Sequence, residues 1–229
     1  MGTVDKIYIL HGWTYSTDKW SDFLELLEKE GFKPNLLKIP GLTEKIDRAW
    51  NLDDYVEWLN KKIGSETILI GHSSGGRLAL AYSLKYPQKV KQLILMDSAG
   101  VYHKELSIRI KRFLFRKIAK WGKKITKYQG LRGLLYKLAG EMDYKQASPV
   151  MRETMKNLIS VDLTPRLTEI KPPTLIIWGE QDKTTPVFDG RLMYKLIPNS
   201  KFHIIKDAKH SPMFTHPSEV VKIIAKEIK

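Results

Sequence analysis

The chain of 229 residues is 42% hydrophobic and 28% charged and carries a formal net charge of +14, a composition typical of one soluble globular domain with at most a modest insertion. Cysteine is absent, which excludes disulfides, thiolate catalysis and zinc–thiolate sites. The sequence has no run of ~18 apolar residues and begins without the basic and apolar segments of a signal peptide, so we expect a cytoplasmic protein with no transmembrane helix.

Residues 1–100 alternate short apolar runs with amphipathic stretches. The apolar runs end at glycine or at a polar turn, which is typical of buried strands. We expect such strands at 6–12, 34–41, 66–71 and 90–98. Between them, apolar side chains recur at helical spacing, which predicts helices at 18–31, 51–64 and 74–86.

Residues 101–160 interrupt this alternation, because they carry helical patterns and no strand pattern. Within them, the stretch 148–159 is expected to form a helix with Ser148 as its cap and Pro149 in its first turn. The alternation then resumes, with strands expected at 172–179 and 201–207 and helices at 186–198 and 216–228.

Strands separated by single helices predict an α/β fold, in which a mainly parallel, doubly wound sheet is covered by helices on both faces. We expect residues 1–100 and 161–229 to form this core and residues 101–160 to form a helical cap insertion. Ligands of such sheets bind at the carboxyl ends of the strands. The residues that follow each strand are therefore the candidates for a functional site.

A serine, an aspartate and a histidine follow three of the expected strands, in that chain order: Ser73, Asp182 and His210. A serine hydroxyl becomes an effective nucleophile when a neighbouring base removes its proton. We expect His210 to be that base and Asp182 to orient it, as in a catalytic triad. The backbone amides of Trp13 and Ser74 are the expected donors to the oxyanion that forms during attack.

Ser73 occupies a tight turn between an expected strand and an expected helix, in the stretch Gly71-His72-Ser73-Ser74-Gly75. Such a turn makes the serine project outward, and the first amides of the following helix have no partner within that helix. Gly71 and Gly75 are expected because a Cβ at either position would collide with the neighbouring element.

Four stretches of this sequence resemble motifs of the α/β-hydrolase family. They are the serine turn at 71–76, "ILHGW" at 9–13, "PPTLIIWGEQDKTTP" at 172–186 and "AKH" at 208–210. The resemblance covers nearly the whole chain and implies serine-hydrolase chemistry beneath a helical cap. It also implies that His11 lies beside the oxyanion site, where it fixes its loop and borders the substrate. Residues 39–50 depart from the family pattern, which leaves the preferred acyl group open.

Two aspartates are candidates for orienting the histidine. Asp182 precedes a Thr-Thr-Pro turn, as the usual acid of the family does. Asp97 also ends an expected strand, at a position where some α/β-hydrolases place the acid. We favour Asp182, and we expect Asp97 to cap the turn that leads into the insertion.

The insertion is the basic part of the chain: residues 101–160 carry a net charge of +11 and the rest of the chain +3. Its apolar side chains are expected to line an acyl pocket, namely Phe113, Leu114, Trp121, Leu134 and Leu135. Its basic side chains either keep the cap soluble or dock an anionic partner, an acidic carrier protein or an anionic lipid surface. Nucleic acid is disfavoured, because no known nucleic-acid-binding motif accompanies the charge.

Trp13 after His-Gly, together with a basic cap, is similar to the pimeloyl-carrier-protein methyl ester esterases, which act on an acyl chain presented by an acidic protein.

The sequence therefore predicts a serine hydrolase, specifically a carboxylesterase that cleaves small or medium acyl esters of small molecules. The alternatives within the fold are a carrier-protein-linked acyl ester esterase, a C–C bond hydrolase, a lactonase and an acyltransferase. Outside catalysis, the alternative is a binding module that uses the basic cap. No cofactor is needed for this chemistry, and the scattered histidines predict no metal site.

Overall fold

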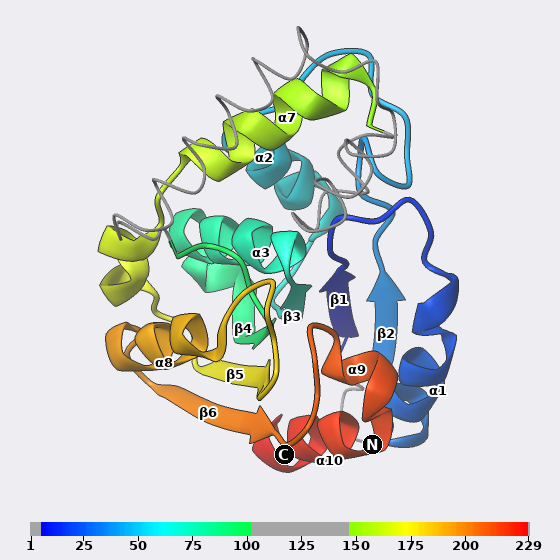
Figure 1. Ribbon diagram of the computed structural model, residues 1–229, viewed down its shortest axis with the longest axis vertical. Coiled ribbons are helices and arrows are strands. Elements are labelled where there is room, and N and C mark those ends of the chain that lie inside the picture. Colours follow the sequence, from blue (N-terminus) through cyan, green and yellow to red (C-terminus); the bar gives the residue numbers. More distant parts are fainter. Residues whose placement is uncertain (1–5, 102–146, 229) are drawn as a thin grey trace, which may run out of the picture. The chain divides into compact units, whose positions relative to one another are not determined.

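The computed structural model describes residues 6–101 and 147–228, and these contain a six-stranded sheet in the order β2-β1-β3-β4-β5-β6 (Figure 1). Every neighbouring pair of strands is parallel. The strands are β1 (Lys6–Leu10), β2 (Lys33–Leu36), β3 (Thr67–His72), β4 (Val90–Met96), β5 (Thr174–Gly179) and β6 (Ser200–Ile205). The predicted α/β architecture with a parallel sheet is confirmed.

Helices follow the strands as the alternation predicts. They are α1 (Ser21–Lys29), α2 (Leu52–Lys62), α3 (Ser74–Lys85), α7 (Pro149–Ser160), α8 (Val187–Leu196), α9 (Pro212–Thr215) and α10 (Pro217–Ile228), with short 3-10 helices η1 (Asp18–Trp20), η2 (Pro87–Lys89) and η3 (Thr164–Glu169). The short helices α9, η2 and η3 lie outside the predicted elements, because one or two turns have too few residues to establish a helical repeat.

The second strand is shorter than the predicted 34–41, since β2 ends at Leu36. The cause is a local turn: the amide of Ile39 donates to the hydroxyl of Thr43, and the amide of Gly41 donates to the carbonyl of Glu44, each at 2.7 Å. These amides are therefore bonded within the loop and cannot extend the ladder with β1.

Alternate side chains of each strand enter two different core layers, as the period of two in a strand requires. In β1, Ile7 and Ile9 pack with apolar side chains of α1, α9 and α10. Tyr8 and Leu10 pack on the opposite face, with apolar side chains of α2, α3 and α8. Figure 1 shows these two helix layers on either side of the strands. Because both faces are covered, the central strand β3 is buried at all six of its positions.

The strand order reverses direction between β1 and β3: β2 lies on the far side of β1, whereas β4 to β6 follow β3. Crevices at such a switch point, outside the carboxyl ends of the strands, are where α/β sheets bind ligands. The loops that leave β1 and β3 carry Trp13 and Ser73, so two of the predicted site residues lie beside the switch point.

The chain separates into two compact units, Met1–Val101 with Pro149–Lys229, and Tyr102–Ser148. Helix α7 belongs to the first unit, where the hydroxyl of Thr154 accepts the amide of Trp50 at 3.0 Å. Residues 102–146 lie outside the described part of the chain, so the predicted cap boundaries of 101–160 stay a prediction. The same holds for the predicted acyl-pocket residues Phe113, Leu114, Trp121, Leu134 and Leu135.

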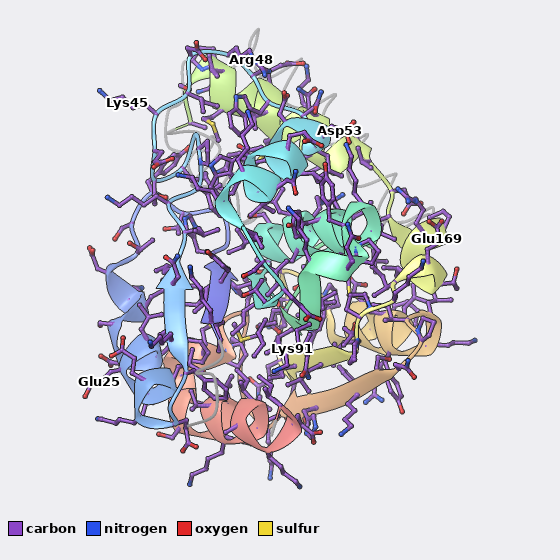
Figure 2. All side chains as sticks on the ribbon, turned by 180° about the vertical axis from the view of Figure 1, so that it is seen from behind. Glu25, Lys45, Arg48, Asp53, Lys91 and Glu169 are labelled. Atoms are coloured by element: carbon purple, nitrogen blue, oxygen red, sulfur yellow. The ribbon has the colours of Figure 1, made fainter. Side chains whose placement is uncertain are left out.

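Charged side chains gather on the outside of the described core. Glu25, Lys45 and Glu169 are exposed and point outward from their elements (Figure 2). Among the described residues, no helix combines the length and the apolar character needed to cross a lipid bilayer.

Candidate functional site

Ser73 forms the turn between β3 and α3 with a φ of 53° and a ψ of −119°, a conformation that L-residues seldom adopt. The glycines around it are required by close contacts. A Cβ on Gly75 would lie 2.2 Å from the carbonyl oxygen of Leu10, and one on Gly71 would lie 2.6 Å from the Cα of Gly76. Both contacts are far shorter than atoms tolerate, so the collision predicted for these two glycines is confirmed.

A continuous chain of hydrogen bonds joins Ser73, His210 and Asp182. Nε2 of His210 lies 3.0 Å from Oγ of Ser73, and Nδ1 of the same ring lies 2.7 Å from Oδ2 of Asp182. His210 comes from the loop between β6 and α9, and Asp182 comes from the loop after β5. The imidazole can thus take a proton from the serine while its other nitrogen donates to a carboxylate.

Asp182 is held in place from several sides. Its Oδ1 accepts the amides of Thr184 and Thr185 at 2.7 and 3.1 Å, and its Oδ2 lies 2.7 Å from the hydroxyl of Thr185. Burial by itself raises the pKa of this carboxyl, but the bonds from His210, Thr185 and Thr184 outweigh it and leave the pKa below its usual range. Asp182 is therefore a fixed anion at neutral pH.

The two predicted oxyanion donors come from segments that lie beside the serine. Ser74 opens α3, so its amide has no partner within the helix. The loop that carries Trp13 approaches closely, since a Cβ on Gly12 would lie 3.1 Å from the Cβ of Ser73. The loop of Trp13 therefore lies beside the serine, and the role of the two amides as oxyanion donors stays a prediction.

His11 is fully buried and links two loops. Its Nε2 lies 3.1 Å from the hydroxyl of Thr43, and its Nδ1 lies 2.7 Å from the carbonyl of Gly12. A carbonyl can only accept, so Nδ1 carries the proton and donates to Gly12. In the neutral ring Nε2 then accepts the hydroxyl proton of Thr43, whose oxygen accepts the amide of Ile39 at 2.7 Å. Burial lowers the pKa of His11, which keeps it neutral. These bonds fit the loop-fixing role expected of His11.

His72 packs beneath the serine turn. Its ring makes edge contacts with Trp20 and Phe214, and its centroid lies 5.0 Å from that of His210. Burial lowers its pKa well below the usual range, with His210 and His11 contributing further. His72 is therefore a neutral packing residue that supports the position of Ser73.

Asp97, the other candidate acid, lies behind the triad. Its Oδ1 accepts the amide of Gly179 at 2.8 Å, whereas His210 directs its Nδ1 to Asp182. The structure thus brings Asp182, the favoured residue, onto the histidine.

His72, Asp97 and His210 form the one cluster of metal-binding side-chain types found among the described residues, with ligand atoms within 4.8 Å of one another. Both ring nitrogens of His210 are already bonded, to Asp182 and to Ser73. The cluster therefore shares its donors with the serine site and offers no independent place for a metal.

Sequence reasoning did not identify two residues that shape the site. Thr185 contacts both Asp182 and His210, the latter at 3.2 Å, and Thr43 holds His11. The Thr-Thr-Pro turn after Asp182 was a signal for the first of them. Thr43 lies in the loop that departs from the family pattern, so no motif marks it.

The chain was compared with known proteins. A profile of the alpha/beta hydrolase fold family matches residues 6–217. The chain is 29% identical to a pimeloyl-[acyl-carrier protein] methyl ester esterase of Wigglesworthia glossinidia brevipalpis, over 100% of this chain and 95% of that protein. It is 26% identical to a 2-hydroxy-6-oxo-6-phenylhexa-2,4-dienoate hydrolase of Comamonas testosteroni, over 91% of this chain and 82% of that protein. A serine hydrolase involved in carbazole degradation, of solved structure, has the same fold, with a TM-score of 0.73 at 19% identity over 100% of this chain and 93% of that one.

Proposed function

Because this chain belongs to the alpha/beta hydrolase family, we propose that it is a carboxylesterase that cleaves small or medium acyl esters, with Ser73 as nucleophile. The observation that carries the proposal is the hydrogen-bonded path from Ser73 through His210 to Asp182, at 3.0 and 2.7 Å. Ser73 and His210 are partly exposed, whereas the carboxyl of Asp182 is buried. A substrate can therefore reach the hydroxyl of Ser73, while the carboxylate of Asp182 stays shielded from solvent.

In the first half of the reaction, Oγ of Ser73 attacks the ester carbonyl carbon and its proton passes to Nε2 of His210. The carbonyl oxygen becomes an oxyanion, which the amides of Trp13 and Ser74 stabilise. When the intermediate collapses, the bond to the alcohol oxygen breaks, and that oxygen takes the proton from Nε2. The alcohol leaves and the acyl group remains on Ser73.

In the second half, a water molecule attacks the acyl carbon and gives a proton to Nε2 of His210. Collapse of the second intermediate breaks the bond to Oγ of Ser73, which recovers this proton, and the carboxylic acid is released. Asp182 stays ionised throughout and holds the imidazole in the tautomer that presents a free Nε2 to the serine.

The proposal is tested by ester hydrolysis and by active-site labelling. The protein should hydrolyse short p-nitrophenyl esters, and a fluorophosphonate probe should attach to the peptide that contains Ser73. In Ser73→Ala labelling should vanish, and kcat should fall by about three orders of magnitude or more. Hydrolysis within about tenfold of the wild-type rate, or a probe on another residue, would contradict the assignment.

A carrier-linked ester is the second candidate substrate. Two observations favour it: the relative from Wigglesworthia is named as an esterase of a carrier-protein-linked methyl ester, and residues 101–160 of this chain carry a net charge of +11. An acidic carrier protein would be drawn to such a charge. If this is the substrate, kcat/KM for a methyl ester on an acidic carrier protein exceeds that for the same methyl ester free in solution.

C–C bond hydrolysis is a third candidate, favoured by the relative from Comamonas, which is named as a hydrolase of a dienoate with 2-hydroxy and 6-oxo groups. The same serine and histidine would serve, since the products are again a carboxylic acid and a protonated leaving group. Consumption of a 2-hydroxy-6-oxo-dienoate, followed by loss of its absorbance, distinguishes this activity. A higher kcat/KM on this compound than on any ester would replace the carboxylesterase proposal.

A further inference from the structure

Asp97 is a fully buried carboxyl group at the end of β4 for which the proposed reaction has no use. Its backbone has a φ of 43°, in the left-handed region that is costly for a residue with a side chain. Its amide donates to the carbonyl of Ile177 at 3.1 Å, which fixes the strained residue to β5. The fold therefore holds this aspartate in an unfavourable conformation, directly behind the hydrogen-bonded path to Ser73.

The two oxygens of the Asp97 carboxyl have different surroundings. Oδ1 accepts the amide of Gly179 at 2.8 Å. Oδ2 is buried and accepts no hydrogen bond from the residues that the structure describes. The groups that face this carboxyl are Asp182, within hydrogen-bonding reach, and the rings of His72 and His210, each with a nitrogen within 4.8 Å. An unpaired buried carboxylate oxygen is costly, and a second carboxylate beside it makes the cost larger.

A proton on Oδ2 resolves both problems. A neutral acid can donate a hydrogen bond to the carboxylate of Asp182, which then carries the only negative charge of the pair. Burial, with a further contribution from Asp182, raises the pKa of Asp97 to about 8, in spite of the opposing bond from Gly179. Asp182, which has the bonds from His210 and two threonines, is the member that ionises.

The hydroxyl of Thr185 has an acceptor other than Asp182, so the carboxylate of Asp182 can accept a hydrogen bond from Asp97 instead. The Thr185 hydroxyl lies 2.7 Å from Oδ2 of Asp182 and 3.0 Å from the carbonyl of Asp97, and its one proton can go to either. When it goes to the carbonyl, a lone pair of Asp182 is free for the proton of Asp97.

We propose that Asp97 is a positioning residue that, as a neutral acid, donates a hydrogen bond from Oδ2 to Asp182 and so fixes the carboxylate that orients His210. This inference rests on the proposed function of the Ser73 site. It separates the roles of two buried aspartates in one site, one ionised and one protonated.

The first test compares Asp97→Asn with Asp97→Ala in ester hydrolysis. Asparagine keeps an acceptor for Gly179 and offers an N–H in place of the O–H, whereas alanine removes both. At pH 7 we expect the kcat of Asp97→Ala to be at least tenfold below that of Asp97→Asn, with both variants folded. Equal kcat values in the two variants would overturn the proposal.

The pH profile supplies a signature that a purely structural role would not give. Ionisation of Asp97 abolishes its hydrogen bond and sets two carboxylates against each other. The kcat of the wild type should therefore fall as the pH rises through about 8, the pKa of Asp97. In Asp97→Asn this fall should be absent, because the amide does not titrate. The same alkaline fall in both proteins would overturn the proposal.

A second test needs no activity, so it stands even if the proposed function fails. The pKa of Asp97 is raised in the folded protein from 3.8 to about 8, so folding takes up a proton between these values. The stability contributed by this group is complete below pH 3.8 and is lost as the pH rises toward 8. Asparagine has no such loss. The Tm of Asp97→Asn minus that of the wild type should therefore increase from pH 4 to pH 8 and level off above it.

The control for the thermal test is Asp47→Asn, which removes an exposed carboxylate from the loop after β2. Its Tm difference from the wild type should change little over the same pH range. If Asp97→Asn behaves like this control, Asp97 is ionised at neutral pH and the proposal is wrong. If the thermal signature is present but no ester is cleaved, the proton assignment stands and the proposed function fails.

Discussion

Three properties of single residues meet at the serine turn: a left-handed backbone at Ser73, two glycines with no space for a Cβ, and a histidine from a distant loop. The strained conformation of Ser73 persists because its neighbours leave no alternative. Its amide donates to the carbonyl of Met96 at 3.1 Å, and its own carbonyl accepts the amide of Ala99 at 2.8 Å. Strain at this position therefore depends on contacts with the end of β4.

Gly75→Ala tests the steric argument. The new Cβ would lie 2.2 Å from the backbone oxygen of Leu10, which cannot move without distorting β1. We expect a loss of about 3 kcal/mol or more in the free energy of unfolding, measured by urea denaturation, together with loss of probe labelling at Ser73. The matched control is Gly64→Ala, where a Cβ meets no atom of the described residues within 4 Å, and its stability should change by less than about 1 kcal/mol.

Asp182→Asn tests the acid at the residue scale. The amide can occupy the same space, but its N–H₂ group cannot accept the Nδ1 proton of His210, so the imidazole adopts the wrong tautomer. We expect kcat to fall by about four orders of magnitude in ester hydrolysis, with little change in KM. A fall of tenfold or less would indicate that another group, such as Asp97, can take over the acid role.

At the scale of elements, the loop from 39 to 51 connects α7 with the loop after β1 that carries Trp13. Met151 of α7 packs against Gly41, where a Cβ would lie 2.3 Å from its sulfur. Two residues farther along this loop, Thr43 bonds His11, and His11 bonds Gly12 next to Trp13. The position of Trp13 therefore depends on a loop that is itself fixed by α7, the last helix of the predicted insertion 101–160.

Thr154→Val removes the bond between α7 and this loop. Valine keeps the volume of the side chain but cannot accept the amide of Trp50, which is now bonded at 3.0 Å. We expect a loss of about 1–3 kcal/mol in the free energy of unfolding, measured by urea denaturation, because a half-buried amide loses its partner. Ser160→Ala, which removes an exposed hydroxyl from the end of the same helix, should cost at most about 0.5 kcal/mol.

The start of α2 is fixed by a capping box. The side chain of Asn51 accepts the amide of Asp54 at 2.9 Å, and the carboxylate of Asp54 accepts the amide of Asn51 at 2.8 Å. Asn51→Ala should lower the free energy of unfolding by about 1 kcal/mol. Asn51→Asp should keep most of the stabilisation from the cap, since aspartate is an equally good capping residue. Equal destabilisation by both variants in urea denaturation would contradict this explanation.

At the scale of the whole molecule, the net charge of +14 is a property that no single contact explains. It is concentrated in residues 101–160, which carry +11. If an acidic carrier protein presents the ester, this charge accelerates the encounter, and salt screens it. The charge would then affect the rate of association rather than the chemistry at Ser73.

Salt dependence tests that idea. Between about 50 and 500 mM NaCl, kcat/KM toward an ester on an acidic carrier protein should fall about tenfold or more. For p-nitrophenyl butyrate, a neutral small ester, the change over the same range should stay below about twofold. Equal salt dependence for both substrates would show that the basic segment plays no part in docking.

The sequence by itself determined the fold and the order of the candidate site residues. Apolar runs and helical spacing depend on local side-chain chemistry, so the parallel sheet and the helices between its strands could be predicted, and so could the loops that carry Ser73, Asp182 and His210. The need for Gly71 and Gly75 followed in the same way from the tight turn between a strand and a helix.

Only the tertiary structure decided which of these residues meet. Whether Asp182 or Asp97 contacts His210 depends on how the loops after β4, β5 and β6 converge. The sequence gives the order of these residues but not the distances between their side chains. The hydrogen bond between Thr43 and His11 and the one between Trp50 and Thr154 could not be predicted for the same reason, since their partners are 32 and 104 residues apart. The burial that raises the pKa of Asp97 likewise arises from the packing of several elements around one carboxyl.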